Sequence, residues 1–173
     1  RWSDIEMNHV RRLVVGIGSH HGDDCIGWTV VDRLKKEWAH VFGGTRFVNC
    51  QLPIDLLDRL DEVDEMHLID AMDGPWRDDS GKSHAIHRVR YADRGDRLAV
   101  RERRLTSSHG MGVLPVLQLA EKLGMPTKHV TLWLVQGESF EPMTPPSAAA
   151  LESIDRCVEM LPKELRHART IAG

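Results

Sequence analysis

Short apolar runs alternate along the chain with segments in which apolar residues recur every three or four positions. The apolar runs predict strands, since a buried strand needs only a few consecutive apolar residues. Strands are expected in RRLVVGIG (11–18), GTRFVNCQ (44–51), DEMHLIDAMDG (64–74), HAIHRVRY (84–91) and HVTLWLVQ (129–136). The third strand is expected to end near Asp70. The fourth alternates with period two from Ala85 to Tyr91, which is typical of a half-exposed strand near a sheet edge.

Helical spacing follows several of these strands. A helix after the first strand is predicted by the apolar stripe Ile26, Val30, Val31, Leu34 and Trp38. Pro53 is suited to the first turn of a short helix that runs through Leu56, Leu57 and Leu60.

Two more helices are predicted in the second half of the chain. One begins near His109, is capped by Ser107 or Ser108, ends at Gly124 and buries Val113, Val116, Leu117 and Ala120. The other opens at Thr144 and Pro145, with its apolar stripe at Leu151, Ile154, Val158 and Leu161.

Alternating strands and helices predict the fold class. We expect a three-layer α/β/α sandwich of the phosphorylase/hydrolase-like type, with a largely parallel, about five-stranded twisted sheet. Residues 1–173 are expected to form a single domain, with 1–8 disordered or extraneous to the fold and 163–173 a loose tail.

Composition narrows the classes of function. A net charge of -3 with 28% charged residues lacks the basic excess of a nucleic-acid binder, so no nucleic-acid partner is expected. No apolar run reaches the roughly 20 residues that span a bilayer, and the first residues lack the apolar core of a signal peptide. We therefore expect a cytoplasmic protein without membrane contact. The thiols Cys25, Cys50 and Cys157 are too far apart to suggest a zinc site or a disulfide framework.

The segment 92–110 is rich in arginine and weakly periodic. It is expected to be a solvated loop, or alternatively a docking surface for an acidic partner.

Polar clusters follow a strand or open a helix at three places: HHGDD (20–24), DAMD (70–73) and SSHG (107–110). The carboxyl ends of parallel strands share one edge, so these clusters are expected to converge. Asp23 and Asp24 can cap a helix start, and Asp70 alone can cap the next turn. His109 alone can be a helix-opening residue that is hydrogen-bonded to Ser107. Together, Asp24, Asp70 and His109 offer two carboxylates and an imidazole, a set that holds a divalent transition metal with open positions.

Other chemistry at the same loop is less well supported by the residues. His20 and His21 are expected to be exposed. Cys25 at a helix start could be a nucleophile with His109 as its base, but Asp23 and Asp24 would raise the pKa of the thiol. The glycines Gly16, Gly18 and Gly22 depart from the dinucleotide-binding spacing, and two carboxylates at the helix entrance would repel phosphate.

Taken in order, these motifs resemble those of the hydrogenase maturation proteases, which trim the C-terminus of the large subunit of nickel-iron hydrogenases. The matching segments are GIGSHHGDDCIG (16–27), LIDAMDG (68–74), SSHGMG (107–112) and a weaker GESFEP (137–142). Ser19 stands where the family usually has asparagine. The resemblance places the family's metal-contacting and catalytic site on Asp24, Asp70 and His109, with their individual catalytic roles unassigned.

The resemblance implies an endopeptidase that removes a C-terminal peptide from a hydrogenase large-subunit precursor after nickel insertion. The nickel would be carried by that precursor and would serve as the recognition element. It could polarise the scissile carbonyl or activate a water, with Asp24 or Asp70 as general base. Two alternatives remain at this stage: a non-catalytic nickel-binding assembly factor, and a nucleotide- or phosphosugar-binding α/β domain.

Overall fold

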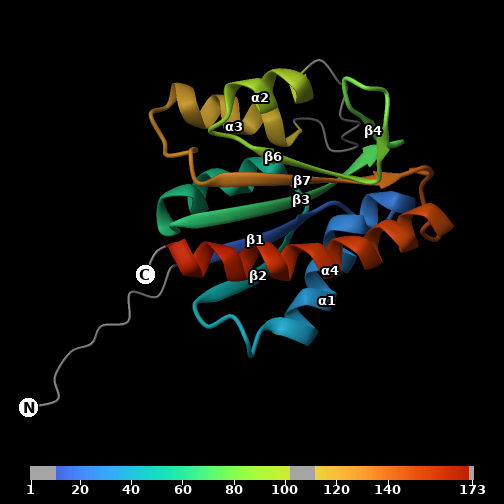
Figure 1. The fold of residues 1–173 in the computed structure, drawn as a ribbon, viewed down its shortest axis with the longest axis horizontal. Helices are drawn as coiled ribbons and strands as arrows, with labels where there is room; N and C mark the ends of the chain where they lie inside the picture. Colours follow the sequence, from blue (N-terminus) through green and yellow to red (C-terminus); the bar gives the residue numbers. More distant parts are fainter. Residues whose placement is uncertain (1–10, 102–111, 172–173) are drawn as a thin grey trace, which may run out of the picture.

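The fold is a central sheet between two helical layers, seen in a computed structural model that describes residues 11–101 and 112–171 (Figure 1). In chain order the elements are β1 (Arg12–Ile17), η1 (Gly22–Cys25), α1 (Ile26–Trp38), β2 (Thr45–Cys50), η2 (Pro53–Glu62), β3 (Glu65–Asp73), β4 (Trp76–Arg77), β5 (Ser83–His84), β6 (Ile86–Arg90), α2 (Arg94–Arg101), α3 (Val113–Lys122), β7 (Val130–Gly137) and α4 (Ala148–Ile171). The elements η1 and η2 are 3-10 helices.

The main sheet has the strand order β2-β1-β3-β7-β6. Its first four strands are parallel, while β6 is antiparallel to β7. The apolar strands β1, β3 and β7 occupy the centre, and the alternating strand β6 lies at an edge, as its pattern predicts. The expected three-layer fold with a largely parallel five-stranded sheet is confirmed.

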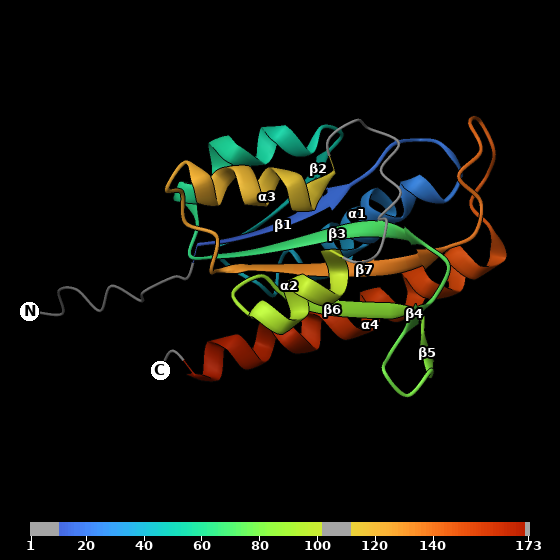
Figure 2. The same cartoon turned by 90° about the horizontal axis from the view of Figure 1, so that it is seen from above.

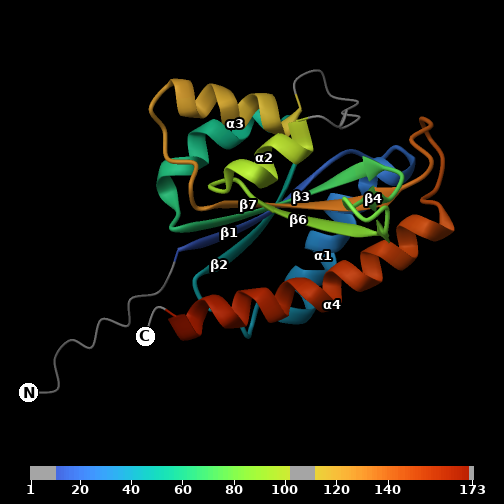
Figure 3. The same cartoon turned by 45° about the horizontal axis from the view of Figure 1, so that its top comes forward.

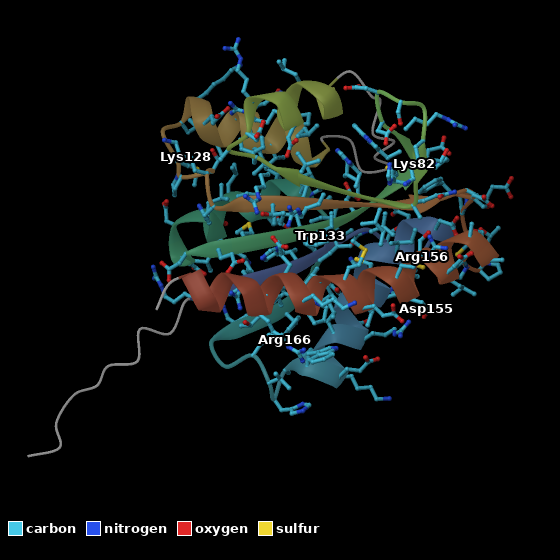
Figure 4. The ribbon with its side chains drawn as sticks, viewed as in Figure 1. Lys82, Lys128, Trp133, Asp155, Arg156 and Arg166 are labelled. Carbon is cyan, nitrogen blue, oxygen red and sulfur yellow. The ribbon has the colours of Figure 1, made fainter. Side chains whose placement is uncertain are left out.

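Each face of the sheet is covered by its own set of helices. Figures 1 and 2 show α3 and the 53–62 segment on one side and α1 with α4 on the other. The first side buries a cluster that includes Leu13, Leu60, Leu68, Leu117 and Leu132. The second buries Val14, Ile26, Leu34, Ile69, Trp133, Ile154 and Leu161. Trp133 lies between the sheet and α4, near the middle of the molecule (Figure 4). Alternation along β1 therefore sends successive side chains into two separate cores.

Strand β3 is longer than expected. It continues past Asp70 to Asp73, because Ala71 and Met72 are buried and stay paired with β7 up to Gly137. A short hairpin of β4 and β5, which the sequence did not predict, follows directly.

The arginine-rich segment is not simply a loop. Its described part contains α2, whose first-turn N–H groups at Gly95 and Asp96 donate to the Asp93 carboxylate. Asp93 is therefore the N-cap of α2. The helix was not predicted from the sequence because the apolar periodicity of this segment is weak. Arg97 of this helix is already paired with Glu121, and Arg88 on the preceding strand β6 is paired with Glu164.

Two helices differ from their predicted bounds. Helix α3 begins at Val113, because Gly112 before it is extended, and not near His109. Helix α4 begins at Ala148, three residues after Pro145, and Ser147 holds its first turn by accepting the N–H of Ala150.

Helix α4 also runs through Pro162, so the residues that were expected to form a loose tail from 163 are helical as far as Ile171. Leu165 is fully buried one turn beyond the proline and continues the packed stripe. Leu151, which was predicted to belong to the buried stripe, is half exposed, and its neighbour Ala150 is buried instead. Among the described residues, no helix is both long and apolar enough to cross a membrane.

Candidate active site

Two glycines let the start of α1 approach the sheet closely. A Cβ at Gly16 on β1 would lie 2.2 Å from the carbonyl oxygen of Gly27, and one at Gly27 would lie 2.3 Å from that of Ile17 and 2.5 Å from that of Ile69. No side chain fits between these backbones. The glycines of the motif thus serve close packing, and they place η1, with its two aspartates, over the carboxyl ends of β1 and β3.

Asp23 anchors a distant loop. Its buried carboxylate accepts four hydrogen bonds, from the N–H groups of Glu138, Ser139 and Ser147 and from the Ser147 hydroxyl. Burial alone would raise the pKa of Asp23, but these hydrogen bonds outweigh it and lower that pKa. All four donors lie outside α1, so the side chain ties loop 138–147 to η1 where a helix cap was expected.

Asp24 and Asp70 form a pair of carboxylates at this edge. Asp24 is buried, and its Oδ2 accepts the hydroxyl of Ser19 at 2.5 Å. Asp70 is half-buried on β3. Burial, and then the nearby charge of Asp24, raise the pKa of Asp70 to about 7, against a smaller opposing effect of the Ala71 N–H. Two of the three predicted site residues are therefore brought together.

The third predicted residue, His109, lies outside the described residues, as do the expected caps Ser107 and Ser108. Within the described ranges 11–101 and 112–171, no group of three or more His, Cys, Asp or Glu side chains is placed to hold a metal ion. The full ligand set of Asp24, Asp70 and His109 thus stays a prediction.

The other polar residues of the first loop have structural partners. His20 is exposed, as expected, and packs edge-to-face on Trp28 with ring centroids 4.7 Å apart. His21 is half-buried, contrary to expectation, because its Nδ1 accepts the N–H of Met143 at 3.3 Å.

Cys25 is a free thiol in a setting that disfavours the thiolate. Burial first, and then the charges of Asp23 and Asp24, raise its pKa despite a hydrogen bond from Thr29. A thiol with a raised pKa is a poor nucleophile near neutral pH.

Sequence reasoning missed the contribution of loop 138–147. The only signal for it was the weak match GESFEP, whose Glu138 and Ser139 supply backbone donors to Asp23. Backbone donors leave no trace in residue type, which explains the weakness of that motif. Figures 2 and 3 show this loop, in orange, projecting at the carboxyl edge of the sheet.

The fold and the site together define a class. The chain is a three-layer α/β/α protein with a carboxylate pair at the carboxyl ends of adjacent parallel strands, the edge where such folds bind their ligands. Solved structures of known proteins narrow this class further. No protein-family model matches the sequence, and no curated protein matches it.

Solved structures do match this chain. The nickel-iron hydrogenase maturation protease HycI from Thermococcus kodakarensis KOD1 has a TM-score of 0.64 and 21% identity, over 92% of this chain and 95% of that chain. An endopeptidase from Escherichia coli has a TM-score of 0.71 and 21% identity, over 91% and 93%. The hydrogenase maturating endopeptidase HybD from Escherichia coli has a TM-score of 0.61 and 24% identity, over 91% and 93%. The chain has the fold of the hydrogenase maturation proteases, and the resemblance drawn from its motifs is confirmed at the level of the fold.

Proposed function

We propose that this chain is an endopeptidase that removes a C-terminal peptide from the large-subunit precursor of a nickel-iron hydrogenase after nickel insertion. The observation that carries the proposal is the pairing of Asp24 with Asp70 at the carboxyl edge of a maturation-protease fold. Asp24 comes from the loop after β1 and Asp70 from β3, as the ordered motifs require.

The carboxylate pair has the chemistry that this activity needs. Asp70 holds its proton strongly, first because it is buried and then because the charge of Asp24 repels a second negative charge nearby. A cation brought to the pair relieves that repulsion, and the pair therefore favours a substrate that carries one. The nickel of a loaded precursor is such a cation, and Asp24, Asp70 and His109 would complete its coordination. An empty precursor lacks this binding energy and would not be cut.

Intact-mass spectrometry of a large-subunit precursor from the same source tests the proposal. The precursor is incubated with this protein, with and without prior nickel loading, and we expect a C-terminal mass loss only in the loaded sample. Asp24→Asn is expected to abolish the loss. Asp73→Asn is the matched control, because Asp73 is an exposed carboxylate three residues beyond Asp70 on the same strand. Complex formation with no mass change in any sample would contradict the protease and favour an assembly factor.

A further inference from the structure

Met143 combines a strained backbone conformation with a highly exposed apolar side chain. It is the only residue other than glycine with a positive φ among the described residues, at 62°. Left-handed backbone crowds the Cβ of any ordinary side chain, and a long apolar residue gains nothing there. Its side chain is also 86% exposed, more than any other large apolar side chain described. A strained backbone conformation that is kept in the folded protein indicates a functional role for the residue.

The backbone around Met143 is held firmly in place. The Thr144 hydroxyl donates to the carbonyl of Glu141 at 2.8 Å, and the Thr144 carbonyl accepts the N–H of Gly22 at 3.0 Å. The Met143 N–H donates to His21. Phe140 of the same loop faces inward and packs on the α1 and α4 core. The loop therefore presents one apolar side chain outward from a fixed frame.

The residues that hold this loop in place are the immediate neighbours of Asp24 in the sequence. His21, Gly22 and Asp23 all bond loop 138–147, and Asp24 follows them directly. Met143 is thus held by the same short segment, 21–23, that leads directly into Asp24. A preformed apolar contact next to a reacting centre serves substrate recognition, and a methionine adapts its flexible, polarisable side chain to a partner.

We propose that Met143 is a substrate-contacting specificity residue, which receives an apolar side chain of the precursor close to the bond that is cut. This inference rests on the proposed function and extends it. Burying the methionine on binding would add affinity that is independent of the nickel contacts.

Three variants test this contact. Asn tolerates left-handed backbone, so Met143→Asn keeps the loop and removes the apolar contact. Met143→Leu keeps the apolar side chain. Leu123→Asn is the matched control, because Leu123 is 62% exposed at the end of α3, by the opposite edge of the sheet. Thermal unfolding of each variant confirms that the fold is intact.

Steady-state processing of nickel-loaded precursor then gives KM and kcat separately. We expect Met143→Asn to raise KM about tenfold or more with kcat within about twofold, since the contact is a binding contact. Met143→Leu and Leu123→Asn should behave as the wild type. An unchanged KM in Met143→Asn, or an equal rise in Leu123→Asn, overturns the inference.

Binding of each variant to the precursor, measured by biolayer interferometry without cleavage, separates this inference from the proposed function. Wild-type binding that Met143→Asn weakens supports the contact even if no peptide is removed. Cleavage by the wild type with equal binding by Met143→Asn overturns the contact alone. A precursor that the wild type neither binds nor cuts overturns both.

Discussion

Asp23 and Ser147, which lie 124 positions apart in the sequence, are joined by two hydrogen bonds of 2.6 Å, one from the Ser147 N–H and one from its hydroxyl. This pair joins the first loop of the sheet to the start of the last helix. Because Ser147 also caps α4, a single carboxylate fixes η1, loop 138–147 and the entry to α4. These hydrogen bonds therefore hold loop 138–147 against the segment that leads into Asp24. Neither Asp23 nor Ser147 is expected to touch the substrate.

Replacing Asp23 by Asn should destabilise the protein strongly. The amide keeps one acceptor oxygen but turns an NH2 group toward buried donors, so we expect a loss of about 3 kcal/mol or more in the free energy of unfolding. Ser147→Ala removes only the hydroxyl, so about 1–2 kcal/mol is expected. Urea unfolding measures both, with the exposed carboxylate variant Asp58→Asn as control. Equal stabilities of Asp23→Asn and Asp58→Asn would show that the four bonds contribute little.

Asp70 should make stability fall as pH rises. The pKa of Asp70 is raised from 3.8, the ordinary value for an aspartate, to about 7 in the folded protein, so the native state binds this proton more tightly than the unfolded chain does. Between about pH 4 and pH 7 the contribution of Asp70 to the stability of the folded protein is therefore lost as the pH is raised. Asp70→Asn removes the effect and should add as much as about 4 kcal/mol at pH 8 while adding nothing at pH 3.5. Urea unfolding at both pH values is the measurement, and a gain that is the same at both would contradict the assigned cause.

Most of the fold could be predicted from the pattern of apolar residues in the sequence. The five main strands and the face of α1 follow from local apolar periodicity, because burial on one or both faces leaves a period that is visible in sequence. The ends of elements were less predictable. The extension of β3 beyond Asp70 depends on its partner β7, and the continuation of α4 past Pro162 depends on buried Leu165, so both are decided by tertiary contacts.

The site was predictable in its residue types but not in its construction. The Asp24 and Asp70 pair follows from the rule that parallel strands end at one edge, and the resemblance singled out the second aspartate of the doublet. The role of Asp23 was mistaken for a helix cap, because its donors are backbone N–H groups more than a hundred residues away. Met143 carries no motif at all, and only its backbone angle reveals it.

Gly27 should tolerate no side chain. A Cβ there would press on the backbone oxygens of Ile17 and Ile69, which belong to two paired strands and cannot move independently. We expect Gly27→Ala to cost about 3 kcal/mol. Gly43→Ala is the matched control, because its Cβ would meet nothing within 4 Å, and its effect should stay within about 0.5 kcal/mol. Thermal or urea unfolding compares the two, and similar values would mean that α1 can move away from the sheet.

Cys25 should be dispensable for activity. Its raised pKa keeps the thiol protonated near neutral pH, so Cys25→Ser should process the precursor within about twofold of the wild-type rate. Iodoacetamide labelling of the native wild type should be slow at pH 7 for the same reason. Complete loss of processing in Cys25→Ser, with normal unfolding, would restore the thiol mechanism that the neighbouring carboxylates argue against.

Asp24 and His109 should act as one unit. If both ligate the nickel that the precursor carries, removing either one breaks the same recognition step, and groups that act together give strongly non-additive losses. Asp24→Ala and His109→Ala should each abolish processing, and the double variant should be no worse than either single one. Binding to nickel-loaded precursor, measured by calorimetry, should fall to the level of unloaded precursor in all three variants. A double variant whose losses multiply, with loaded precursor still preferred, would place His109 outside the site and leave the two aspartates to act without it.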